Sequence, residues 1–212
     1  MLSALRTDHA RWAISRGGAL RFPAAVAPFS GFEPGAEEDL LALHGSGERT
    51  VLVGQRPGDL GGWTVIKEFD VLQMTFEGDA PEEQCSDISL LGADDIPKML
   101  ELTSLVYPSY FRAETATLGD YVGVRAGNAL IAMAGVRMRL PGYEEISAIC
   151  THLDFRGQGL GSQVTRAMIQ RIVRRGHIPF LHTESDNPAQ KMYRKLGFET
   201  RAVLPIVVLE RT

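Results

Sequence analysis

Apolar and polar residues in the second half of the chain follow two regular patterns. In some segments apolar residues recur at helical spacing, and in others they form short runs bounded by glycine or proline, as in strands. Gly127 and Asn128 separate two such runs and predict a hairpin. The complete pattern predicts a mixed sheet with helices, in the order strand 87–91, helix 93–106, strands 120–124, 129–138 and 143–153, helix 160–172, strand 178–182, helix 188–196 and strand 202–209.

The first part of the chain is less regular, and prolines and glycines interrupt residues 23–35. A polar segment with glycine and proline, residues 78–84, has the composition of a linker. We therefore predict a smaller N-terminal α/β domain, residues 1–84, followed by a second domain, residues 85–212. Within the first domain the pattern predicts helix 37–43 and strands 50–53 and 63–76.

The composition is ordinary for a soluble globular protein, since 44% of the 212 residues are hydrophobic and 23% are charged. No apolar run approaches the roughly 20 residues that cross a bilayer, and the N-terminus lacks the pattern of a secretory signal. The two cysteines, Cys85 and Cys150, make neither a disulfide framework nor a zinc-binding spacing. We expect a cytoplasmic protein with no membrane partner and no metal, in which Cys150 is a small core residue.

Charge is unevenly distributed along the chain, whose formal net charge is −4. Residues 31–101 carry 16 acidic and 4 basic side chains, whereas residues 156–201 carry 9 basic and 3 acidic ones. Positive potential is therefore concentrated in the second segment, where it favours an anionic ligand. No nucleic-acid partner is expected, because the whole chain is acidic and lacks basic patches interleaved with aromatic residues.

The most specific motif is a glycine-rich turn between a predicted strand and a predicted helix, Arg156-Gly157-Gln158-Gly159-Leu160-Gly161. Glycine has no side chain, so the backbone can approach a ligand closely. The first amides of the helix lack intrahelical partners and, with the helix dipole, attract negative charge. The turn therefore predicts a site for a phosphate or pyrophosphate. A kinase or dehydrogenase fits poorly, since the Lys-Ser/Thr of a P-loop and the full dinucleotide spacing are both missing.

A second motif, residues 187–198, has the local features of a short helix. Asn187 is a good N-cap, Pro188 suits the first helical position, and Gly197 is a natural C-terminal stop. Helical spacing places Tyr193 on the face that packs toward the sheet. These features by themselves require no function.

Together, the two motifs resemble the GCN5-related N-acetyltransferase (GNAT) family. The first hallmark of that family, Gln/Arg-x-x-Gly-x-Gly/Ala, is matched by Arg156, Gly159 and Gly161. The second hallmark is an Asn, then a Tyr about six residues on, then Leu-Gly-Phe. It is matched by Asn187, Tyr193 and the Leu-Gly-Phe sequence that follows.

The resemblance covers about residues 85–212, and the sequences at 149–152 and 179–182 are similar to the FR47-like branch of the family. It implies a GNAT fold, a mixed and mostly antiparallel sheet flanked by helices, and acetyl-CoA or another acyl-CoA as cosubstrate. The amides of the glycine turn would hold the pyrophosphate, and the strand before it would bond the pantetheine amides. The residues implied to bind the cosubstrate are Ile149, Cys150, Thr151, Arg156, Gly157, Gln158, Gly159, Leu160, Gly161, Ser162 and Asn187.

Acyl transfer from a thioester to an amine needs two proton movements, because the amine must lose a proton and the departing thiolate must gain one. The resemblance implies Tyr193 as the general acid. Two candidates for the base are left open. Glu145 lies where the histone acetyltransferases of this family have a catalytic glutamate, and partial burial would raise the pKa of its carboxyl. His182, at the end of the next strand, is the rival, since histidine changes its charge near neutral pH.

The sequence thus favours an acyl-CoA-dependent N-acyltransferase that acts on a primary amine by direct attack in a ternary complex. No Cys or Ser has the arrangement that a covalent intermediate requires. The alternative is a catalytically inactive protein that senses acyl-CoA. The acceptor, a small molecule or a peptide, is selected in this fold by loops, here about residues 107–119, whose sequence identifies no substrate. Whether the protein forms a homodimer is left open.

Overall fold

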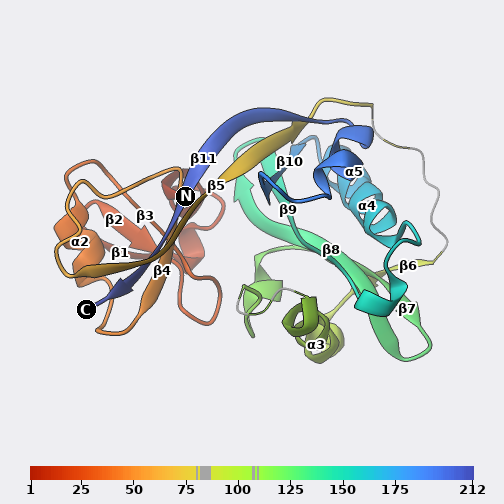
Figure 1. Ribbon diagram of the computed structural model, residues 1–212, viewed down its shortest axis with the longest axis horizontal. Helices are drawn as coiled ribbons and strands as arrows, with labels where there is room; N and C mark the ends of the chain where they lie inside the picture. Colours follow the sequence, from red (N-terminus) through yellow and green to blue (C-terminus); the bar gives the residue numbers. More distant parts are fainter. Residues whose placement is uncertain (80, 82–86, 107, 109) are drawn as a thin grey trace.

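The computed structural model describes residues 1–79, 81, 87–106, 108 and 110–212. Within them, eleven strands form one mixed, mostly antiparallel sheet in the order β1-β2-β3-β4-β11-β5-β10-β9-β8-β7-β6 (Figure 1). The strands are β1 Ile14–Arg16, β2 Ala19–Arg21, β3 Phe29–Phe32, β4 Arg49–Val53, β5 Trp63–Phe76, β6 Ile88–Leu91, β7 Tyr121–Ala126, β8 Ala129–Leu140, β9 Tyr143–Thr151, β10 Ile178–Glu184 and β11 Phe198–Arg211. The α-helices are α1 Leu2–Arg6, α2 Glu37–Ala42, α3 Ile96–Val106, α4 Leu160–Arg174 and α5 Gln190–Lys195.

The predicted order of elements in the second half is confirmed, because β6, α3, β7, β8, β9, α4, β10, α5 and β11 follow one another as expected. In the first half the sequence pattern missed β1, β2 and β3. All four residues of β3 are buried, so no alternation of polar and apolar positions marks it. Gly31 within β3 has the sequence signal of a turn, but here it permits close packing. A Cβ on Gly31 would lie 2.9 Å from the backbone nitrogen of Leu2.

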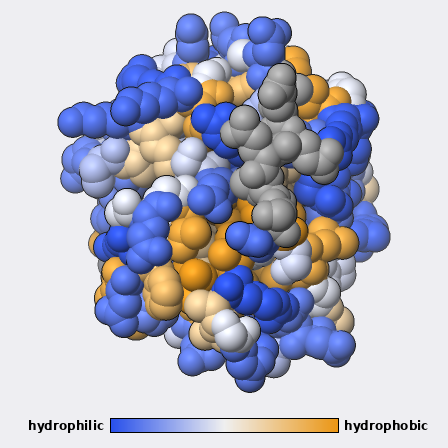
Figure 2. Space-filling view, turned by 90° about the vertical axis from the view of Figure 1, so that its right-hand side faces the viewer, coloured by the Kyte–Doolittle hydropathy of each residue, from blue (hydrophilic) through white to orange (hydrophobic). Residues whose placement is uncertain are grey.

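Helices α3 and α4 cover opposite faces of the sheet formed by the second half of the chain (Figure 1). On one face, Met168 and Ile172 of α4 pack in the same cluster as Ala134 of β8. On the other, Met99 of α3 packs with Met133, the neighbour of Ala134, because successive strand residues point to opposite faces. On the face drawn in Figure 2, hydrophilic residues dominate the outline and apolar residues gather near the centre.

Two long strands, β5 and β11, connect the two halves of the molecule (Figure 1). Strand β11 pairs with β4 of the first half, and β5 lies between β11 and β10. Strand β5 belongs to the first predicted domain, but it is an interior strand of the sheet that continues through the second predicted domain. Part of the predicted linker (residues 80 and 82–84), Cys85 and the boundary between residues 84 and 85 lie outside the described residues, and the division into 1–84 and 85–212 stays a prediction.

Strands β9 and β10 are parallel neighbours that separate after a short contact. Three residues of each strand are paired, the last being Phe180 opposite Glu145. Beyond that point β9 pairs with β8 and β10 pairs with β5, so no described strand pairs with the edges that face the opening. The start of α4 lies beside this opening, because a Cβ on Gly161 would be 3.7 Å from the hydroxyl of Thr151, the last residue of β9.

Candidate active site

The glycine-rich turn before α4 has the backbone that a close approach to a ligand requires. Gly157 and Gly159 have φ values of +79° and +78°, a left-handed conformation that favours glycine. A Cβ at either position would meet nothing within 4 Å, so the space around the turn is open. In the described part of the chain, the amides of residues 157–162 donate to no other backbone group. Open N–H groups at the N-terminus of a 15-residue helix suit a phosphate.

A β-bulge interrupts β9 where the strand borders the opening. Gly135 of β8 pairs with Ser147, but Met133 pairs with Cys150, so β9 contains one extra residue in between. Ala148 lies in the bulge with a φ of +50°, which is uncommon for a residue other than glycine. A bulge turns backbone groups out of the strand ladder and is frequent next to active sites. It lies on the strand whose backbone is expected to bond pantetheine.

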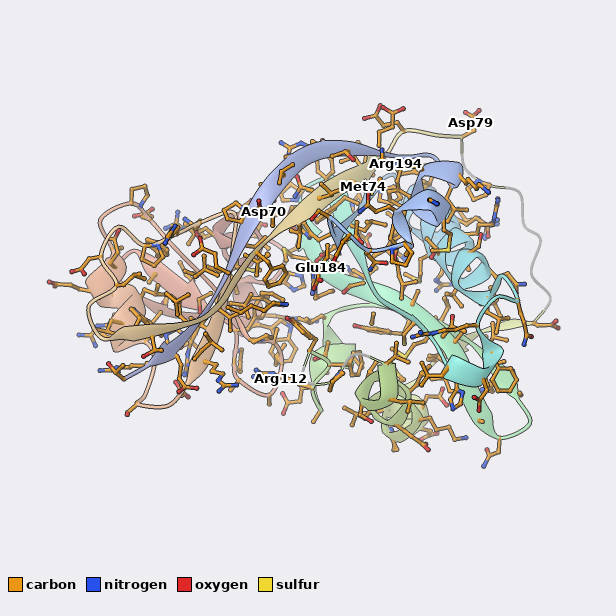
Figure 3. All side chains as sticks on the ribbon, in the orientation of Figure 1. Asp70, Met74, Asp79, Arg112, Glu184 and Arg194 are labelled. Atoms are coloured by element: carbon orange, nitrogen blue, oxygen red, sulfur yellow. The ribbon has the colours of Figure 1, made fainter. Side chains whose placement is uncertain are left out.

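A cavity of about 190 Å³ lies where the opening between β9 and β10 meets the strands of the first half. Its polar side includes His182 and Glu184 of β10, Asn187, and Tyr193 of α5. Glu184 is labelled in Figure 3 and lies near the centre of the molecule, between the two halves. The opposite side is apolar and comes from β3, β4, β5 and β11, with Phe29, Val51, Val53, Phe69, Val71 and Ile206. Both halves of the chain therefore build the cavity.

Asn187 and Tyr193 each have a structural contact in addition to their place in the cavity wall. The Oδ1 atom of Asn187 accepts a hydrogen bond from the backbone N–H of Ala189 at 2.9 Å, which stabilises the turn into α5. Tyr193 is the buried residue of α5, and its ring packs edge-on against Phe198 with 6.2 Å between ring centroids. The prediction that Asn187 is the N-cap is wrong, because α5 begins at Gln190, its N-cap is Ala189, and no side chain of the described residues caps it.

Five polar side chains, one from each of five adjacent strands, form a hydrogen-bonded chain across the sheet. Arg137 of β8 donates Nε to Glu145 Oε2 of β9 at 3.0 Å, and its Nη2 donates to Glu145 Oε1. The Nδ1 atom of His182 on β10 lies 2.7 Å from the same Oε1. Its Nε2 atom lies 3.1 Å from Nε2 of Gln73 on β5. Arg201 of β11 donates Nη1 to Gln73 Oε1.

The partners in this chain fix which atom donates in each bond. Arg201 can only donate, so Gln73 must accept with Oε1 and present its N–H group to His182. An ionised Glu145 can only accept, so His182 donates from Nδ1 and accepts from Gln73 at Nε2. His182 is thereby held as the neutral tautomer with its proton on Nδ1.

Glu145 is fully buried, and the pKa of its carboxyl is lowered, whereas the sequence analysis expected it to be raised. Burial alone would raise the pKa of this carboxyl. The positive charge of Arg137, together with His182 and the hydrogen bonds from both residues, reverses the effect and lowers the pKa to about 2. The expectation of a raised pKa is therefore wrong, because the sequence did not reveal Arg137 as the partner of Glu145.

Cys150 also lines the cavity but has the properties of a core residue, as expected. It packs in the cluster of Met99 and Tyr121 beneath α3. Burial raises the pKa of its thiol to about 12, so the thiolate that a nucleophile needs is disfavoured.

Comparison with known proteins agrees with this geometry. The family model described as FR47-like protein matches residues 121–204, a segment that contains both motifs. A crystal structure from Novosphingobium aromaticivorans DSM 12444, assigned to the GNAT family, aligns with 100% of this chain and 96% of its own. Its TM-score is 0.95 and its sequence identity is 32%. This chain belongs to the GCN5-related N-acetyltransferase (GNAT) family.

Other acetyltransferases are also similar to this chain. N-alpha-acetyltransferase RimI of Mycobacterium tuberculosis is 32% identical over 97 residues, which are 43% of this chain and 60% of RimI. Mycothiol acetyltransferase of Corynebacterium aurimucosum is 40% identical over 60 residues, which are 27% of this chain and 20% of that protein. This GNAT chain thus matches less than two thirds of either curated relative. A GNAT structure from Kribbella flavida shares the fold, with a TM-score of 0.64 and 21% identity over 99% of this chain and 93% of its own.

In this GNAT chain the structure brings five of the predicted site residues into the cavity wall. The cavity is lined by Ile149, Cys150, His182, Asn187 and Tyr193. Thr151 and the glycine turn, residues 156–162, are not part of the cavity wall. The turn follows β9 at the opening between β9 and β10 and is exposed at residues 156–159. Glu145 does not line the cavity, but its described partners Arg137 and His182 do.

The sequence pattern did not mark Arg137, Gln73 or Tyr121, which belong to the hydrogen-bonded chain or to the cavity wall. Arg137 is a charged residue within the apolar run 129–138, and this charge is the sequence signal that could have identified it. Gln73 and Tyr121 are ordinary strand residues, and no local pattern distinguishes them.

In the part of the chain that the structure describes, no helix is long and apolar enough to cross a membrane.

Proposed function

We propose that this GNAT protein is an acyl-CoA-dependent N-acyltransferase that transfers an acetyl group from acetyl-CoA to a primary amine by direct attack in a ternary complex. One arrangement carries the proposal. An open glycine turn at a helix N-terminus lies beside two splayed strands, and the cavity between them contains Tyr193 and His182. The turn would bind the diphosphate of the cosubstrate, and the cavity would hold the reacting groups.

The residues present fit such a cosubstrate. Among the described residues, the amides of residues 157–162 have no backbone partner, and they would hold the two phosphates. The bulged strand at Ile149–Thr151 would bond the pantetheine amides, and Asn187 would contact the pantetheine arm. The buried hydroxyl of Thr183 on β10, in the cavity wall, has no partner among the described residues and would gain one from a ligand.

Proton transfer in this proposal uses Tyr193 and His182, with Glu145 in a positioning role. Tyr193 would protonate the departing thiolate. Glu145 is poorly suited to remove a proton, because its pKa is lowered to about 2 and both of its oxygens accept hydrogen bonds. We assign the base to His182 Nε2, which accepts the amine proton once the N–H group of Gln73 is displaced.

A thiol-release assay tests the proposal. The protein is incubated with acetyl-CoA and a panel of primary amines, and free thiol is followed. Tyr193→Phe should lower kcat by about 100-fold while leaving the KM for acetyl-CoA nearly unchanged, since only the proton donor is lost. Tyr143→Phe, which removes an exposed hydroxyl at the start of β9, is the control and should keep full activity. Acetyl-CoA binding without release above background for any amine would instead support the sensor function.

The two base candidates are separated by pH profiles of kcat/KM. His182→Gln should abolish the acidic limb of the profile, because the proposed base is gone. Glu145→Gln should lower the rate but retain that limb, because it removes only the group that orients His182. A profile left unchanged by both substitutions would exclude both residues as the base and favour an ordered water.

A further inference from the structure

Two hydrogen-bond donors in the cavity wall have no protein partner in the described residues. The hydroxyl of Tyr121 on β7 is buried and unpaired, and the residue is only 2% exposed. Arg137 donates Nε and Nη2 to Glu145, but its Nη1 donates to no described group. One fifth of the Arg137 side chain is exposed, and both residues line the cavity. A buried donor without a partner is rare in folded proteins and needs an explanation, such as an ordered water or a bound ligand.

The two donors lie close to each other. The ring of Tyr121 lies directly over Gly135, where a Cβ would come within 2.1 Å of it. Arg137 is two residues further along β8, and its charge acts on the Tyr121 hydroxyl. Burial raises the pKa of this hydroxyl, so it stays protonated and can donate. A guanidinium N–H and a phenol O–H side by side suit a carboxylate.

The cavity wall next to these donors is apolar. Strands of the first half contribute Val51, Val53, Phe69 and Val71, none of which can form a side-chain hydrogen bond. The guanidinium of Arg137 lies 4.8 Å from the centre of the Phe29 ring, which belongs to the same wall. The anion-binding donors are therefore at the border of a surface that suits an aliphatic or aromatic side chain.

These observations, on the basis of the proposed function, define the chemistry of the acceptor. We infer that the acceptor is an α-amino acid with an apolar side chain, whose carboxylate is bound by Arg137 Nη1 and the Tyr121 hydroxyl. Arg137 Nη2 and His182 Nδ1 both bond to Oε1 of Glu145, so the two side chains are neighbours in the cavity wall. An α-amino acid offers a carboxylate for Arg137 and an amine for His182 in one small molecule.

The reaction balances with groups already named. The amine nitrogen forms a bond to the acetyl carbon, the carbon–sulfur bond breaks, and the electron pair of that bond leaves with sulfur. The amine proton passes to His182 and the thiolate takes a proton from Tyr193. The product is an N-acetyl amino acid.

Calorimetry on the full chain loaded with CoA tests the inference without depending on turnover. The probes are L-leucine, its decarboxylated analogue isopentylamine, L-leucinamide and L-serine. L-leucine should bind at least tenfold more tightly than the other three. Leucinamide separates a free amino acid from a peptide N-terminus, because its carboxylate is replaced by an amide. Equal binding of leucine and isopentylamine, or no binding of leucine, would overturn the inference.

Tyr121→Phe is the decisive variant, since it removes the hydroxyl and keeps the ring over Gly135. It should weaken leucine binding about tenfold, leave isopentylamine unchanged and not lower the melting temperature. Tyr143→Phe is the matched control and should bind leucine as the parent protein does. Arg137→Lys keeps a positive charge beside Glu145 but lacks Nη1, and it should lose leucine affinity as well. A Tyr121→Phe protein with full leucine affinity would contradict the assignment.

The outcomes for the two proposals differ. Release of thiol with isopentylamine as readily as with leucine would overturn the amino-acid inference and support the acyltransferase. Tight, Tyr121-dependent binding of leucine without thiol release would support the amino-acid site and contradict the proposed activity.

Discussion

Glu145 shows how a single buried carboxylate can position a base instead of acting as one. Arg137 and His182 hold it from two sides, and no part of the residue is exposed. An ion pair in such surroundings is costly to break, because the partner that stays behind is an uncompensated buried charge. The role of Glu145 is therefore tied to the stability of the sheet as well as to the tautomer of His182.

Glu145→Gln should change the pH dependence of stability. The pKa of Glu145 is lowered from the ordinary 4.5 to about 2, so its ionised form stabilises the fold. This contribution is complete above about pH 4.5 and is lost as the pH falls toward 2, by roughly 3 kcal/mol in all. Glu145→Gln should be less stable at pH 7, and its deficit relative to the parent should shrink between pH 5 and pH 2.

Urea unfolding at several pH values measures this difference. Glu144, whose pKa is also lowered by Arg175 and His177, is present in both proteins and cancels in the comparison. A deficit that is the same at pH 7 and pH 3 would contradict the assignment.

The pair of Glu145 and Arg137 also shows which features of the site could be predicted from the sequence and which could not. The backbone of the glycine turn and the buried position of Tyr193 could be predicted because local motifs mark them. The partner of Glu145 could not, because Arg137 is on another strand and reaches it through a register shift between Val136 and Met138. Long-range pairing of this kind leaves no local pattern.

At the scale of elements, helix α4 has a glycine of left-handed conformation at each end. Gly159 has a φ of +78° and Gly176 a φ of +77°, and a Cβ at either would meet nothing within 4 Å. Replacing either by alanine therefore introduces a similar backbone strain, about 1 kcal/mol. Only Gly159 lies in the turn that we propose to bind the diphosphate.

Gly159→Ala and Gly176→Ala should therefore destabilise the protein equally but affect acetyl-CoA differently. We expect Gly159→Ala to weaken acetyl-CoA binding about tenfold or more, because the strained backbone moves the open amides. Gly176→Ala should bind acetyl-CoA with the parent affinity. Calorimetry and thermal unfolding on both variants give the two quantities. Equal affinities would show that the turn does not hold the cosubstrate.

There is also a physical reason why some helices and strands could be predicted from the sequence and others could not. Helices α3 and α4 each bury one face, so their periodicity is visible in the sequence. Strands β7 and β8 are buried on both faces, and two apolar runs around the Gly127-Asn128 turn mark them instead. Strands β1 to β3 have three or four residues each and lack a visible period. Their position depends on pairing with β4 and packing against α1 and α2, which only the whole fold provides.

At the scale of the whole molecule, β5 and β11 tie the two halves into one sheet, and this predicts cooperative unfolding. Both tryptophans, Trp12 and Trp63, belong to the first half, whereas most helical residues belong to α3, α4 and α5. Tryptophan fluorescence and helical circular dichroism therefore report on different halves. The two signals should give the same midpoint in urea, and acetyl-CoA should raise both midpoints together.

Leu52→Ala distinguishes a tied sheet from two independent halves. Leu52 is fully buried in the core of the first half, beside Trp63 and Leu209, so its truncation should cost about 2–5 kcal/mol. If the long strands transmit this loss, the fluorescence and dichroism midpoints fall by the same amount. Since the first half also forms the apolar wall of the cavity, acetyl-CoA should restore part of the loss in both signals. A shift confined to fluorescence would mean that the halves unfold separately.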